Sequence, residues 1–221
     1  MQMIPIRVFF HKTGRAKYIS HLDVMRAMTR ALGRSGLPLW FTEGFNPHLY
    51  LTFTLPLPLG YESVCESLDL RLTEEMPPEQ VAGRIQAVLP PGFQVVHVAP
   101  PQAKSTAIQW ADYRAELDFA AADPLELERA FADFCAQPAI VVSKRTKKGD
   151  KPMDIRPHVQ VMEREFFSNR ATFMLRCAAG TTLNINPTLF LQAFCATVGL
   201  QPQRSRLLRV QMRSADLQPF A

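Results

Sequence analysis

Hydrophobic and polar residues alternate in many short segments of the chain, which is the pattern of strands that bury one face. Residues 4–12 show it clearly, because apolar side chains recur at every second position from Ile4 to Phe10. Further segments with strand character are predicted at 39–41, 51–55, 64–72, 93–99, 108–119, 140–146, 157–165, 171–177 and 206–213. The chain is therefore rich in short strands with a buried side.

Helical spacing of apolar residues interrupts these strands at intervals. In 20–35, Ser20 and Asp23 form the pattern of a capping box, and Gly36 marks the stop. The later helices each begin with proline, which the first helical turn tolerates. They are predicted at 77–88, 124–136 and 187–198, and the last two are capped by Asp123 and Asn186.

The order of these elements is strand, helix, strand, strand, helix, strand in the first half. The second half repeats this order with one extra strand, although the two halves show no sequence self-similarity. This is the order of a split βαβ unit, so we predict an α+β protein of tandem ferredoxin-like units, with antiparallel sheets and helices on one face. The expected domains are 1–103 and 104–221, which meet in the segment APPQAKS at 99–105.

The composition is that of an ordinary globular protein, with 47% hydrophobic and 20% charged residues among 221. The N-terminal sequence MQMIPIRVFF lacks the pattern of a secretory signal, and no apolar run approaches the roughly 20 residues of a membrane helix. The four cysteines are isolated, without the CxxC spacing of zinc or iron–sulfur sites. We therefore expect a reduced cytoplasmic protein with buried thiols, no metal, no cofactor and no membrane contact.

The formal net charge is +5 and the isoelectric point is about 9.2, which favours polyanionic partners. In the helix at 20–35, Arg26, Arg30 and Arg34 recur at every fourth position, opposite the apolar side. With a rise of about 1.5 Å per residue they are roughly 6 Å apart along the axis, close to the spacing of phosphates on one strand. They could follow an RNA backbone. Alternatively, they form a solvated face on which Asp23 pairs with Arg26.

A second basic cluster lies in 143–151, SKRTKKGDK, with Gly149 at the predicted tip of a hairpin. Its cations are Lys144, Arg145, Lys147, Lys148 and Lys151. A basic hairpin can insert along an RNA groove, although many such tips are merely solvated. A third cluster near the C-terminus consists of Arg204, Arg206, Arg209 and Arg213. Three basic clusters in one small chain favour binding to nucleic acid.

Two titratable residues lie where apolar residues are expected. His21 falls on the apolar side of its helix at the first helical position, and Glu66 shares the parity of the apolar residues in 64–72. A carboxylate on a core face needs a partner, which would be His21 or an arginine. The alternative for His21 is a satisfied polar core residue without a role in chemistry.

The segment TEGFNPHLY, residues 42–50, is a turn that carries a histidine and aromatic residues. Gly44 permits an unusual backbone angle and Pro47 keeps Asn46 out of helical geometry, so that His48 is presented on a stiff loop. We predict that this loop packs against the start of the helix at 20–35, where free N–H groups favour an anion. The resulting polar site would contain Ser20, His21, Asp23, Asn46 and His48. Alternatively, the loop's polar side chains only hydrogen-bond its own backbone.

Several segments resemble the motifs of the radical-SAM-linked protein family of unknown function. They are FHKTG at 10–14, KYISHLDVMRAMTRAL at 17–32, LPLWFTEGFNPHLYLTFTLPLPLGYES at 37–63, ESLDLRL at 66–72 and KPMDIRPHV at 151–159. The chain departs from the family at Leu49, where a second proline or a basic residue is common. The resemblance implies a stand-alone partner of a cobalamin-type radical SAM protein, because the CxxxCxxC motif of the radical enzyme is missing from this sequence.

We therefore expect an RNA-binding accessory protein, without chemistry of its own, that presents RNA to a radical SAM partner. The anion- or RNA-binding residues would be Ser20, His21, Asp23, Arg26, Arg30, Arg34, Asn46, His48, Lys144, Arg145, Lys147 and Lys148. One alternative is a metal-independent endoribonuclease that uses His21 and His48, by analogy of fold with CRISPR repeat-processing endoribonucleases. Glu66 or Asp23 would then orient one histidine. Another alternative is a protein-interaction module whose basic stripe docks on an acidic partner.

Overall fold

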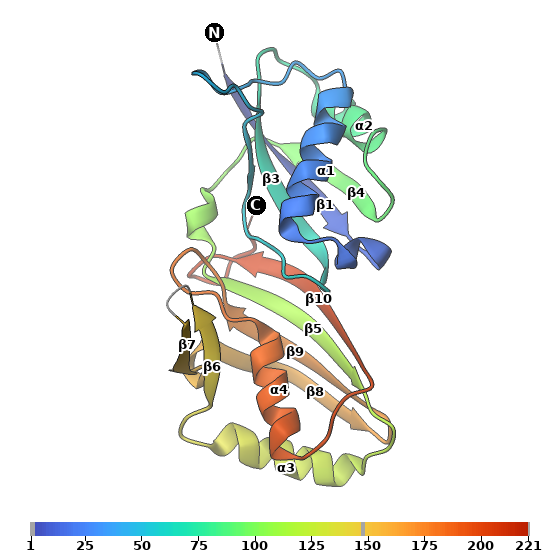
Figure 1. The fold of residues 1–221 in the computed structure, drawn as a ribbon, viewed down its shortest axis with the longest axis vertical. Coiled ribbons are helices and arrows are strands. Elements are labelled where there is room, and N and C mark those ends of the chain that lie inside the picture. The colour runs from blue at the N-terminus through green and yellow to red at the C-terminus, as the bar shows by residue number, and fades with distance from the viewer. Residues whose placement is uncertain (1–2, 147–148, 221) are drawn as a thin grey trace. The chain divides into compact units, whose positions relative to one another are not determined.

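The structure is a computed structural model that describes residues 3–146 and 149–220 (Figure 1). The chain divides into two compact units. Unit 1 comprises Met1–Ile108 and Gln218–Ala221, and unit 2 comprises Gln109–Leu217. The domain boundary expected near residue 103 stays a prediction, because a division by contacts does not show whether either part folds alone.

Unit 1 has the element order of one split βαβ unit. Its strands and α-helices are β1 (Ile4–Lys12), α1 (His21–Arg34), β2 (Leu51–Phe53), β3 (Glu62–Leu72), α2 (Pro78–Gln86) and β4 (Phe93–Ala99), with short 3₁₀ helices at Gly14–Tyr18 and Ser105–Ala107. The strand order is β4-β1-β3, with β2 paired to β3, and every pairing is antiparallel. This is the ferredoxin-like arrangement, so the predicted fold is confirmed for this half.

The core of unit 1 lies between its sheet and the two α-helices. Ile6, Val8 and Phe10 of β1 pack in one cluster with Met28 and Leu32 of α1. The Ser20 side chain caps α1 by accepting a hydrogen bond from the Asp23 amide, as the capping pattern predicts. The observed bounds of β1, α1 and β4 therefore agree closely with the predicted segments.

The last residues of the chain belong to unit 1 because they cover a buried arginine. Arg7 is fully buried, donates two hydrogen bonds to Asp69, and lies 4.6 Å from the centre of the Phe220 ring. Its guanidinium also donates to the Ala103 carbonyl at 2.8 Å. A buried guanidinium needs such partners, since burying an unpaired charge is costly.

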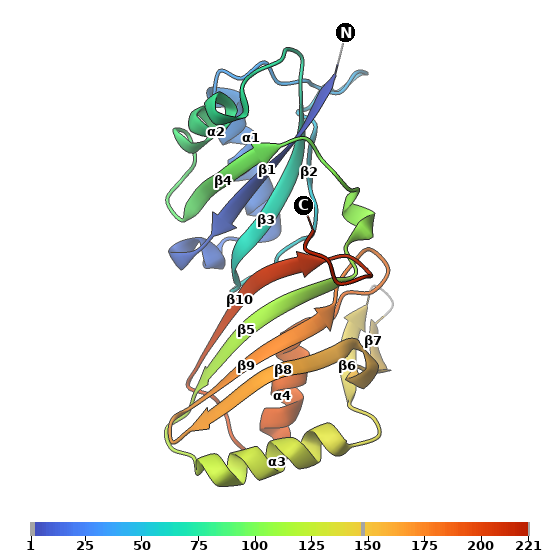
Figure 2. The same cartoon turned by 180° about the vertical axis from the view of Figure 1, so that it is seen from behind.

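Unit 2 repeats the arrangement of unit 1 (Figure 2). Its elements are β5 (Trp110–Asp118), α3 (Pro124–Ala136), β6 (Val141–Thr146), β7 (Gly149–Asp154), β8 (Val159–Phe167), β9 (Arg170–Ala178), α4 (Pro187–Thr197) and β10 (Arg204–Arg213), with a short 3₁₀ helix at Arg156–His158. The sheet order is β10-β5-β9-β8. Once β6 and β7 are set aside, this is again the ferredoxin-like order, and the side chains of Asp123 and Asn186 cap α3 and α4 as predicted.

The extra strand of the second half belongs to a hairpin. The sequence predicts strands at 140–146 and 157–165 around a basic loop, but β6 pairs with β7 in a separate two-stranded sheet. The sequence of β7, GDKPMD, has no apolar alternation, so the period-two pattern cannot reveal it. Pro152 is tolerated because a strand of a two-stranded hairpin has a free edge.

The core of unit 2 is built largely from phenylalanine. Phe131 and Phe134 of α3 contact Phe190 and Phe194 of α4, and the ring centres of Phe131 and Phe194 are 4.9 Å apart. Phe173 of β9 lies 5.2 Å from Phe131 in the same cluster. These aromatic contacts hold both helices on one face of the sheet.

The cysteines only partly match the expectation of buried thiols. Cys177 and Cys195 are buried, whereas Cys65 and Cys135 are half-buried, and all four are free thiols. Burial raises the pKa of Cys195 to about 11, so this thiol is a packing residue rather than a nucleophile. Within the described part of the chain, no helix is long and apolar enough to cross a membrane.

Candidate nucleic-acid interface

The basic cluster at 143–151 lies on the hairpin formed by β6 and β7, which we call the basic hairpin. Its base is anchored by Ile140 and Ile155, which are 4% and 0% exposed and joined by a backbone hydrogen bond of 2.9 Å. The Asp154 carboxylate accepts hydrogen bonds from the Ile140 and Arg156 amides at 2.9 and 3.0 Å. The segment DIRP of the KPMDIRPHV motif therefore fixes the hairpin to unit 2.

The carboxylate at the base of the basic hairpin is held in its charged form. The amides of Arg156 and Ile140 donate to Asp154, and these hydrogen bonds lower the pKa of its carboxyl group below the ordinary value. The same interaction ties the end of β7 to the residue before β6. The hairpin is therefore closed at its base by an ionised carboxylate, that of Asp154.

The described surface of the basic hairpin is open to solvent. Val141 is 62% exposed, and Lys151 is exposed in β7. The backbones of Lys144 and Arg145 lie in β6, in register with Lys151 and Asp150. The predicted contact residues Lys147 and Lys148 lie outside the described residues.

The basic hairpin holds most of the net charge of the protein. Five cations and one carboxylate lie within 144–151, which gives this segment a formal charge of +4 out of +5 for the whole chain. The sequence of the hairpin therefore has the composition typical of segments that bind polyanions.

Three of the four arginines near the C-terminus are engaged within unit 2, which corrects the interpretation from sequence in part, whereas Arg204 is exposed. On the sheet face of unit 2, Arg206 donates to Glu116 at 3.1 Å and Arg213 to Asp112 at 2.6 Å. Arg209 is fully buried, with its guanidinium 5.8 Å from the centre of the Tyr113 ring. The acids that pair with Arg206 and Arg213 lie on β5. Counting charges along the sequence does not reveal which residues of two strands lie opposite each other.

Asp112 is the centre of this ionic network. Its carboxylate is almost fully buried and accepts hydrogen bonds from both Arg176 and Arg213. Burial acts to raise the pKa of Asp112, but the two guanidinium groups outweigh it and hold the pKa below the ordinary value. These arginines are therefore engaged in ion pairs inside unit 2.

The arginine stripe of α1 is exposed but only partly free. Arg26 donates to Asp23 at 3.0 Å, and Arg34 donates to the Val88 carbonyl at 3.4 Å. The Ser20 hydroxyl, followed by Arg26, lowers the pKa of Asp23, so this carboxylate stays charged beside the start of the stripe. Among the described residues, Arg30 forms no ion pair. The cations available to a ligand on this helix are therefore Arg30 and Arg34.

The core-face carboxylate predicted at Glu66 is buried, and it lies in a polar cluster at the start of α1. Lys12 and Glu66 are each 3% exposed, and both line a cavity of about 10 Å³ together with His21. This volume is at the lower limit for a single water molecule. The His21 ring lies 5.1 Å from the Phe53 ring in an edge-to-face contact. His21 is thus half-buried, as expected for the first position of the helix.

Sequence reasoning missed Lys12 as a member of this cluster. The signal was present, because Lys12 has the same parity as Ile6, Val8 and Phe10 on β1. Lys12 and Glu66 thus place a cation and a carboxylate on the wall of the same small cavity. The cluster therefore explains why FHKTG, SHLD and ESLDLRL each contribute a polar residue to one place.

The site predicted to contain both His21 and His48 stays a prediction, and the contacts of the two histidines involve different residues. Trp40 donates to the Arg71 carbonyl and Phe41 pairs with Leu49, so the loop at 42–48 projects from the end of β3 near Leu72. About 16 Å of extended chain separates His48 from Phe53, the residue that contacts His21. In a split βαβ unit, the connection after the first helix leaves from the helix end. The base of the loop therefore lies beside the end of β3, at Arg71 and Leu72.

His48 and Asn46 are instead bonded within their own loop. The His48 ring nitrogen Nδ1 lies 2.9 Å from the Thr42 hydroxyl and 3.2 Å from the Asn46 carbonyl. His48 thus bonds within its own loop, as the alternative expects, and Asn46 takes part through its backbone carbonyl. Whether Ser20, His21, Asp23, Asn46 or His48 contacts an anion stays a prediction.

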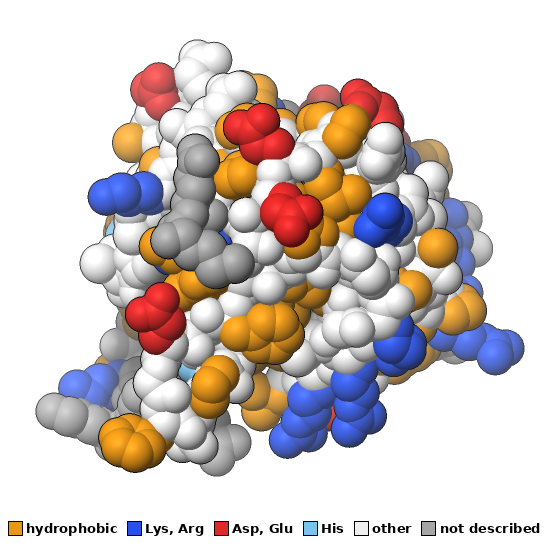
Figure 3. Space-filling model, turned by 90° about the horizontal axis from the view of Figure 1, so that it is seen from above, with side chains coloured by type: hydrophobic (Ala, Val, Ile, Leu, Met, Phe, Trp, Pro, Cys, Tyr) orange, Lys and Arg blue, Asp and Glu red, His pale blue; other side chains and the backbone are white. Residues whose placement is uncertain are grey.

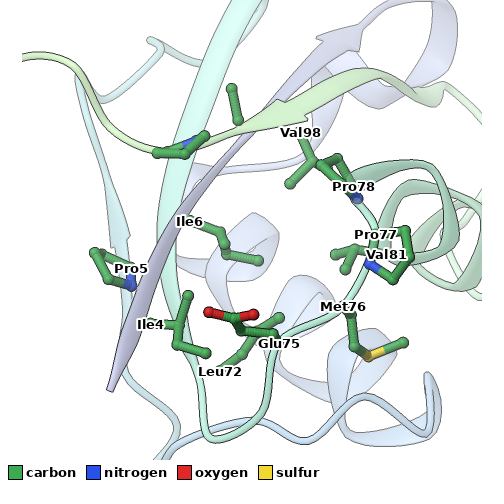
Figure 4. A pocket seen from close by; sticks show the side chains of 12 residues that line it. Ile4, Pro5, Ile6, Leu72, Glu75, Met76, Pro77, Pro78, Val81 and Val98 are labelled. Atoms are coloured by element: carbon green, nitrogen blue, oxygen red, sulfur yellow. The ribbon is translucent and has the colours of Figure 1, made fainter. Parts of the chain in front are cut away.

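A pocket of about 440 Å³ lies in unit 1 between the sheet and the start of α2 (Figure 4). Its wall includes Ile4, Ile6, Val81 and Val98, and the Glu75 carboxylate points into it. Among the described residues that line it, none is lysine or arginine. Such a wall does not suit a phosphate, so this pocket is separate from the polyanion-binding features.

Metal binding has no candidate in the described residues, since no three His, Cys, Asp or Glu side chains are grouped to hold an ion. The fold and the basic hairpin together define the class: a protein of two ferredoxin-like units with an exposed cationic hairpin. The chain belongs to the family described as "Uncharacterized protein conserved in bacteria (DUF2344)", whose model matches residues 5–187. Among curated proteins, none matches the chain in sequence.

Two solved structures share the fold. They are "Crystal Structure of a Cbf5-Nop10-Gar1 Complex" (11% identity, TM-score 0.50, 94% of this chain and 48% of that chain) and "Structure of H/ACA RNP bound to a substrate RNA containing 2'-deoxyuridine" (11%, 0.50, 97% and 49%). This chain spans about half the length of the matched chains. At this identity, the likeness concerns the fold alone.

A structure of Cse3 from Thermus thermophilus bound to an RNA is also similar, at 16% identity over 82% of this chain and 87% of that chain. Its TM-score of 0.26 is too low to support an argument. The analogy with CRISPR endoribonucleases therefore gains nothing from this comparison.

Proposed function

We propose that the protein is an RNA-binding accessory protein that contacts RNA mainly through the basic hairpin. The observation that carries this proposal is the formal charge of +4 on 144–151, in a hairpin whose described surface is exposed. Lysines on a projecting hairpin can approach phosphates without losing interactions inside the fold. Arg30 and Arg34 of α1 provide a second set of exposed cations.

The proposed enzyme partner is a radical SAM protein. Support comes from the motifs in which this chain resembles the radical-SAM-linked family, and these include the DIRP segment that anchors the hairpin. In this proposal the protein works in the cytoplasm and leaves the chemistry to its partner. One protein of similar fold is described as a ribonucleoprotein bound to a substrate RNA, but the proposal depends on the hairpin and not on that likeness.

The endoribonuclease alternative has lost its main support. It required His21 and His48 to share a proton path, and general acid–base catalysis works only within hydrogen-bond reach or through one water. The contacts of His21 with Phe53 and of His48 with Thr42 place the two rings on different parts of unit 1. No observation now favours ribonuclease activity over binding.

Filter binding of tRNA and rRNA fragments at 50 and 200 mM salt tests the proposal. Four hairpin contacts to phosphates predict an affinity loss of about 50- to 150-fold over this range, because each contact releases counterions. An absence of binding at 50 mM salt would overturn RNA binding. So would an affinity that does not change with salt, because it would exclude phosphates as the main contact.

A further inference from the structure

The sheet of unit 1 has one face that is turned away from α1 and α2, which we call the outer face (Figure 2). In the ladder of β1 and β3, Ile6 lies opposite Leu70, and both side chains belong to the core under the helices. Successive side chains of a strand point to opposite faces. Pro5 and Arg71, which form the neighbouring pair of the ladder, therefore lie on the outer face.

Arg71 lies against two aromatic rings on this outer face. Its guanidinium carbon is 5.1 Å from the centre of the Trp40 ring and 4.2 Å from that of the Tyr50 ring. The backbone holds both rings in place, because the Trp40 amide donates to the Arg71 carbonyl at 2.9 Å and the Tyr50 amide donates to the Trp40 carbonyl at 3.3 Å. All three residues, which we call the Arg71 cluster, are half-buried. The guanidinium is thus positioned before a ligand binds, which lowers the cost of ordering a long side chain.

The charge of Arg71 is not neutralised by an acid. Within the described residues Arg71 forms no ion pair, and its Nη1 atom contacts the Met3 sulfur at 3.4 Å. Asp69 is the neighbouring carboxylate on the same face of β3, and Arg7 already donates to both of its oxygens. Figure 3 looks onto this end of unit 1, where acidic side chains lie scattered among hydrophobic and uncharged ones. A half-buried arginine without an acid suits an anionic ligand.

We infer that the Arg71 cluster binds one nucleotide of single-stranded RNA. Arg71 donates to a phosphate, since the planar fork of a guanidinium matches phosphate oxygens, and the unpaired base stacks on the ring of Trp40 or Tyr50. An unpaired cation beside two aromatic rings fits a ligand that joins an anion to a flat ring, as a nucleotide does. An acidic peptide would satisfy Arg71 but offer no such partner to the rings. The inference rests on the proposed function and adds a second kind of RNA contact to it.

The two kinds of contact differ in the RNA that they accept. Lysines of the basic hairpin contact phosphates, which paired and unpaired RNA both present. The Arg71 cluster needs a base that is free to leave its own stack, so it accepts single-stranded RNA and excludes a duplex. The cluster should therefore give the protein a preference for single-stranded RNA that the hairpin alone does not provide.

Photo-cross-linking tests the stacking contact in the unaltered chain. A short oligouridylate with one 4-thiouridine is irradiated with the protein at low salt, and the cross-linked residues are identified by peptide sequencing. We expect a cross-link at Trp40 or Tyr50, because a stacked base lies in contact with one of these rings. The control probe is the same oligonucleotide annealed to oligoadenylate, which should cross-link there only weakly. Cross-links that avoid both residues, or equal cross-linking of the duplex, would overturn the inference.

Filter binding of the same two probes measures the contribution of Arg71. Arg71→Gln should lower the affinity for the single strand by about tenfold and that for the duplex by less than about twofold. Arg71→Lys should behave like Arg71→Gln, because an ammonium group keeps the charge but lacks the planar fork. A variant that misfolds would weaken binding of both probes, so the ratio of the two affinities separates a lost contact from a lost fold.

The matched control is Arg84→Gln, since Arg84 is an exposed arginine of α2 that donates to the Gly36 carbonyl at 2.8 Å. It should change neither affinity by more than about twofold. An unchanged ratio of single-strand to duplex affinity in Arg71→Gln contradicts the inference. So does a loss in Arg84→Gln as large as that in Arg71→Gln, because any arginine of unit 1 would then serve.

The inference and the proposed function can fail separately. When the hairpin lysines are replaced by Gln, the 4-thiouridine probe should still cross-link at Trp40 or Tyr50 at a raised protein concentration. If these replacements leave RNA affinity unchanged, the hairpin is not the main contact, and the cross-link still decides whether the Arg71 cluster binds a nucleotide. If they weaken binding while Arg71→Gln keeps the preference for single strands, the proposed function stands and the inference is wrong.

Discussion

The basic hairpin and the sheet face of unit 2 are both rich in cations, but the two regions use them differently. On the sheet face, Arg170, Arg176, Arg206 and Arg213 each contact a carboxylate of β5 within 3.1 Å. On the hairpin, five cations share one carboxylate, Asp150. The sheet arginines pair with acids of a neighbouring strand, whereas the hairpin segment contains many more cations than acids in its sequence.

The difference follows from strand register. In the β5–β9 ladder, Asp112 faces Arg176 and Asp118 faces Arg170, so acid and base alternate across neighbouring strands. In the hairpin ladder, Lys144 faces Lys151, a pairing of like charges that costs stability. In our proposal, the phosphates of RNA supply the counter-charge for this pair. A count of Lys and Arg along the sequence cannot distinguish cations that face acids on a neighbouring strand from cations that face like charges.

The largest expected effect is the loss of stability when the sheet network is broken. Asp112→Asn leaves Arg176 and Arg213, which are 13% and 24% exposed, without a negative partner. We expect the free energy of unfolding to fall by about 3 kcal/mol, measured by urea denaturation. RNA affinity of the folded variant should not change, because this face does not contact RNA.

The control for Asp112→Asn is Asp133→Asn, a change at an exposed position of α3. It should alter the free energy of unfolding by less than about 0.5 kcal/mol. If Asp112→Asn lowers the free energy of unfolding by less than about 1 kcal/mol, the ion pairs of Asp112 stabilise the fold no more than ordinary surface ion pairs do. The sheet arginines would then not differ from the hairpin cations in their contribution to stability.

Neutralising the basic hairpin should give the next largest effect, this time on RNA. Replacing Lys144, Lys147, Lys148 and Lys151 by Gln removes four cations without touching the buried base at Ile140. At 0.1 M salt we expect an affinity loss of about 100-fold or more in the filter assay, with a flatter salt dependence. Stability should not fall, because like charges across the hairpin are removed.

The sheet face provides the comparison for this variant. Arg170→Gln/Arg206→Gln removes two cations that are 41% and 36% exposed but paired with acids. Its RNA affinity should stay within about twofold, since the net potential of that face changes little. Equal losses for the hairpin and sheet variants would show that only total charge matters, and the hairpin would lose its special role.

A smaller effect is expected on α1, where two arginines of one stripe differ in their partners. Arg30→Gln should weaken RNA binding by about threefold, whereas Arg26→Gln should have almost no effect, because Asp23 already neutralises Arg26. The same filter assay measures both. If Arg26→Gln weakens binding as much as Arg30→Gln does, the pair with Asp23 opens on binding.

Most of the fold could be predicted from sequence because its signals are local. Capping residues such as Ser20, Asp123 and Asn186 mark helix starts, and the alternation in β1 marks a strand. The element order then leaves few topologies, and the split βαβ arrangement is one of them. The basic hairpin was predicted only in part. A strand was expected at 140–146, but β7 was not, because its sequence has neither alternation nor strong strand formers.

The candidate site was harder to predict because it depends on which segments meet. The partners of Arg206 and Arg213 lie on β5, roughly 90 to 100 residues earlier in the sequence, and only the sheet register brings them together. The loop with His48 was expected beside the start of α1, and sequence spacing alone does not say which residues pair with its base, which are Arg71 and Leu72 of β3 for the neighbouring Trp40 and Leu39. By contrast, the place of Lys12 on the core face could have been predicted, because Lys12 has the same parity as the buried apolar residues of β1.

The smallest expected effect concerns the anchor of the basic hairpin and its dependence on pH. The two amide hydrogen bonds lower the pKa of Asp154 in the folded protein. A lowered pKa means that the carboxylate stabilises the fold at pH values above its unfolded pKa of about 4. That contribution is lost as the pH falls through the lower folded value. Between pH 7 and 5 the anchor should therefore be constant.

Hydrogen exchange of the Ile140 and Arg156 amides, corrected for intrinsic rates, measures this anchor. Between pH 7 and 5 their protection should not change, and Asp154→Ala should lower it by about fivefold while RNA affinity falls by about twofold. Asp150→Ala, which removes the exposed acid of the same hairpin, should leave both amides protected. If Asp154→Ala leaves the protection of both amides intact, Asp154 does not anchor the hairpin. Backbone pairing and the burial of Ile155 would then be sufficient to hold its base in place.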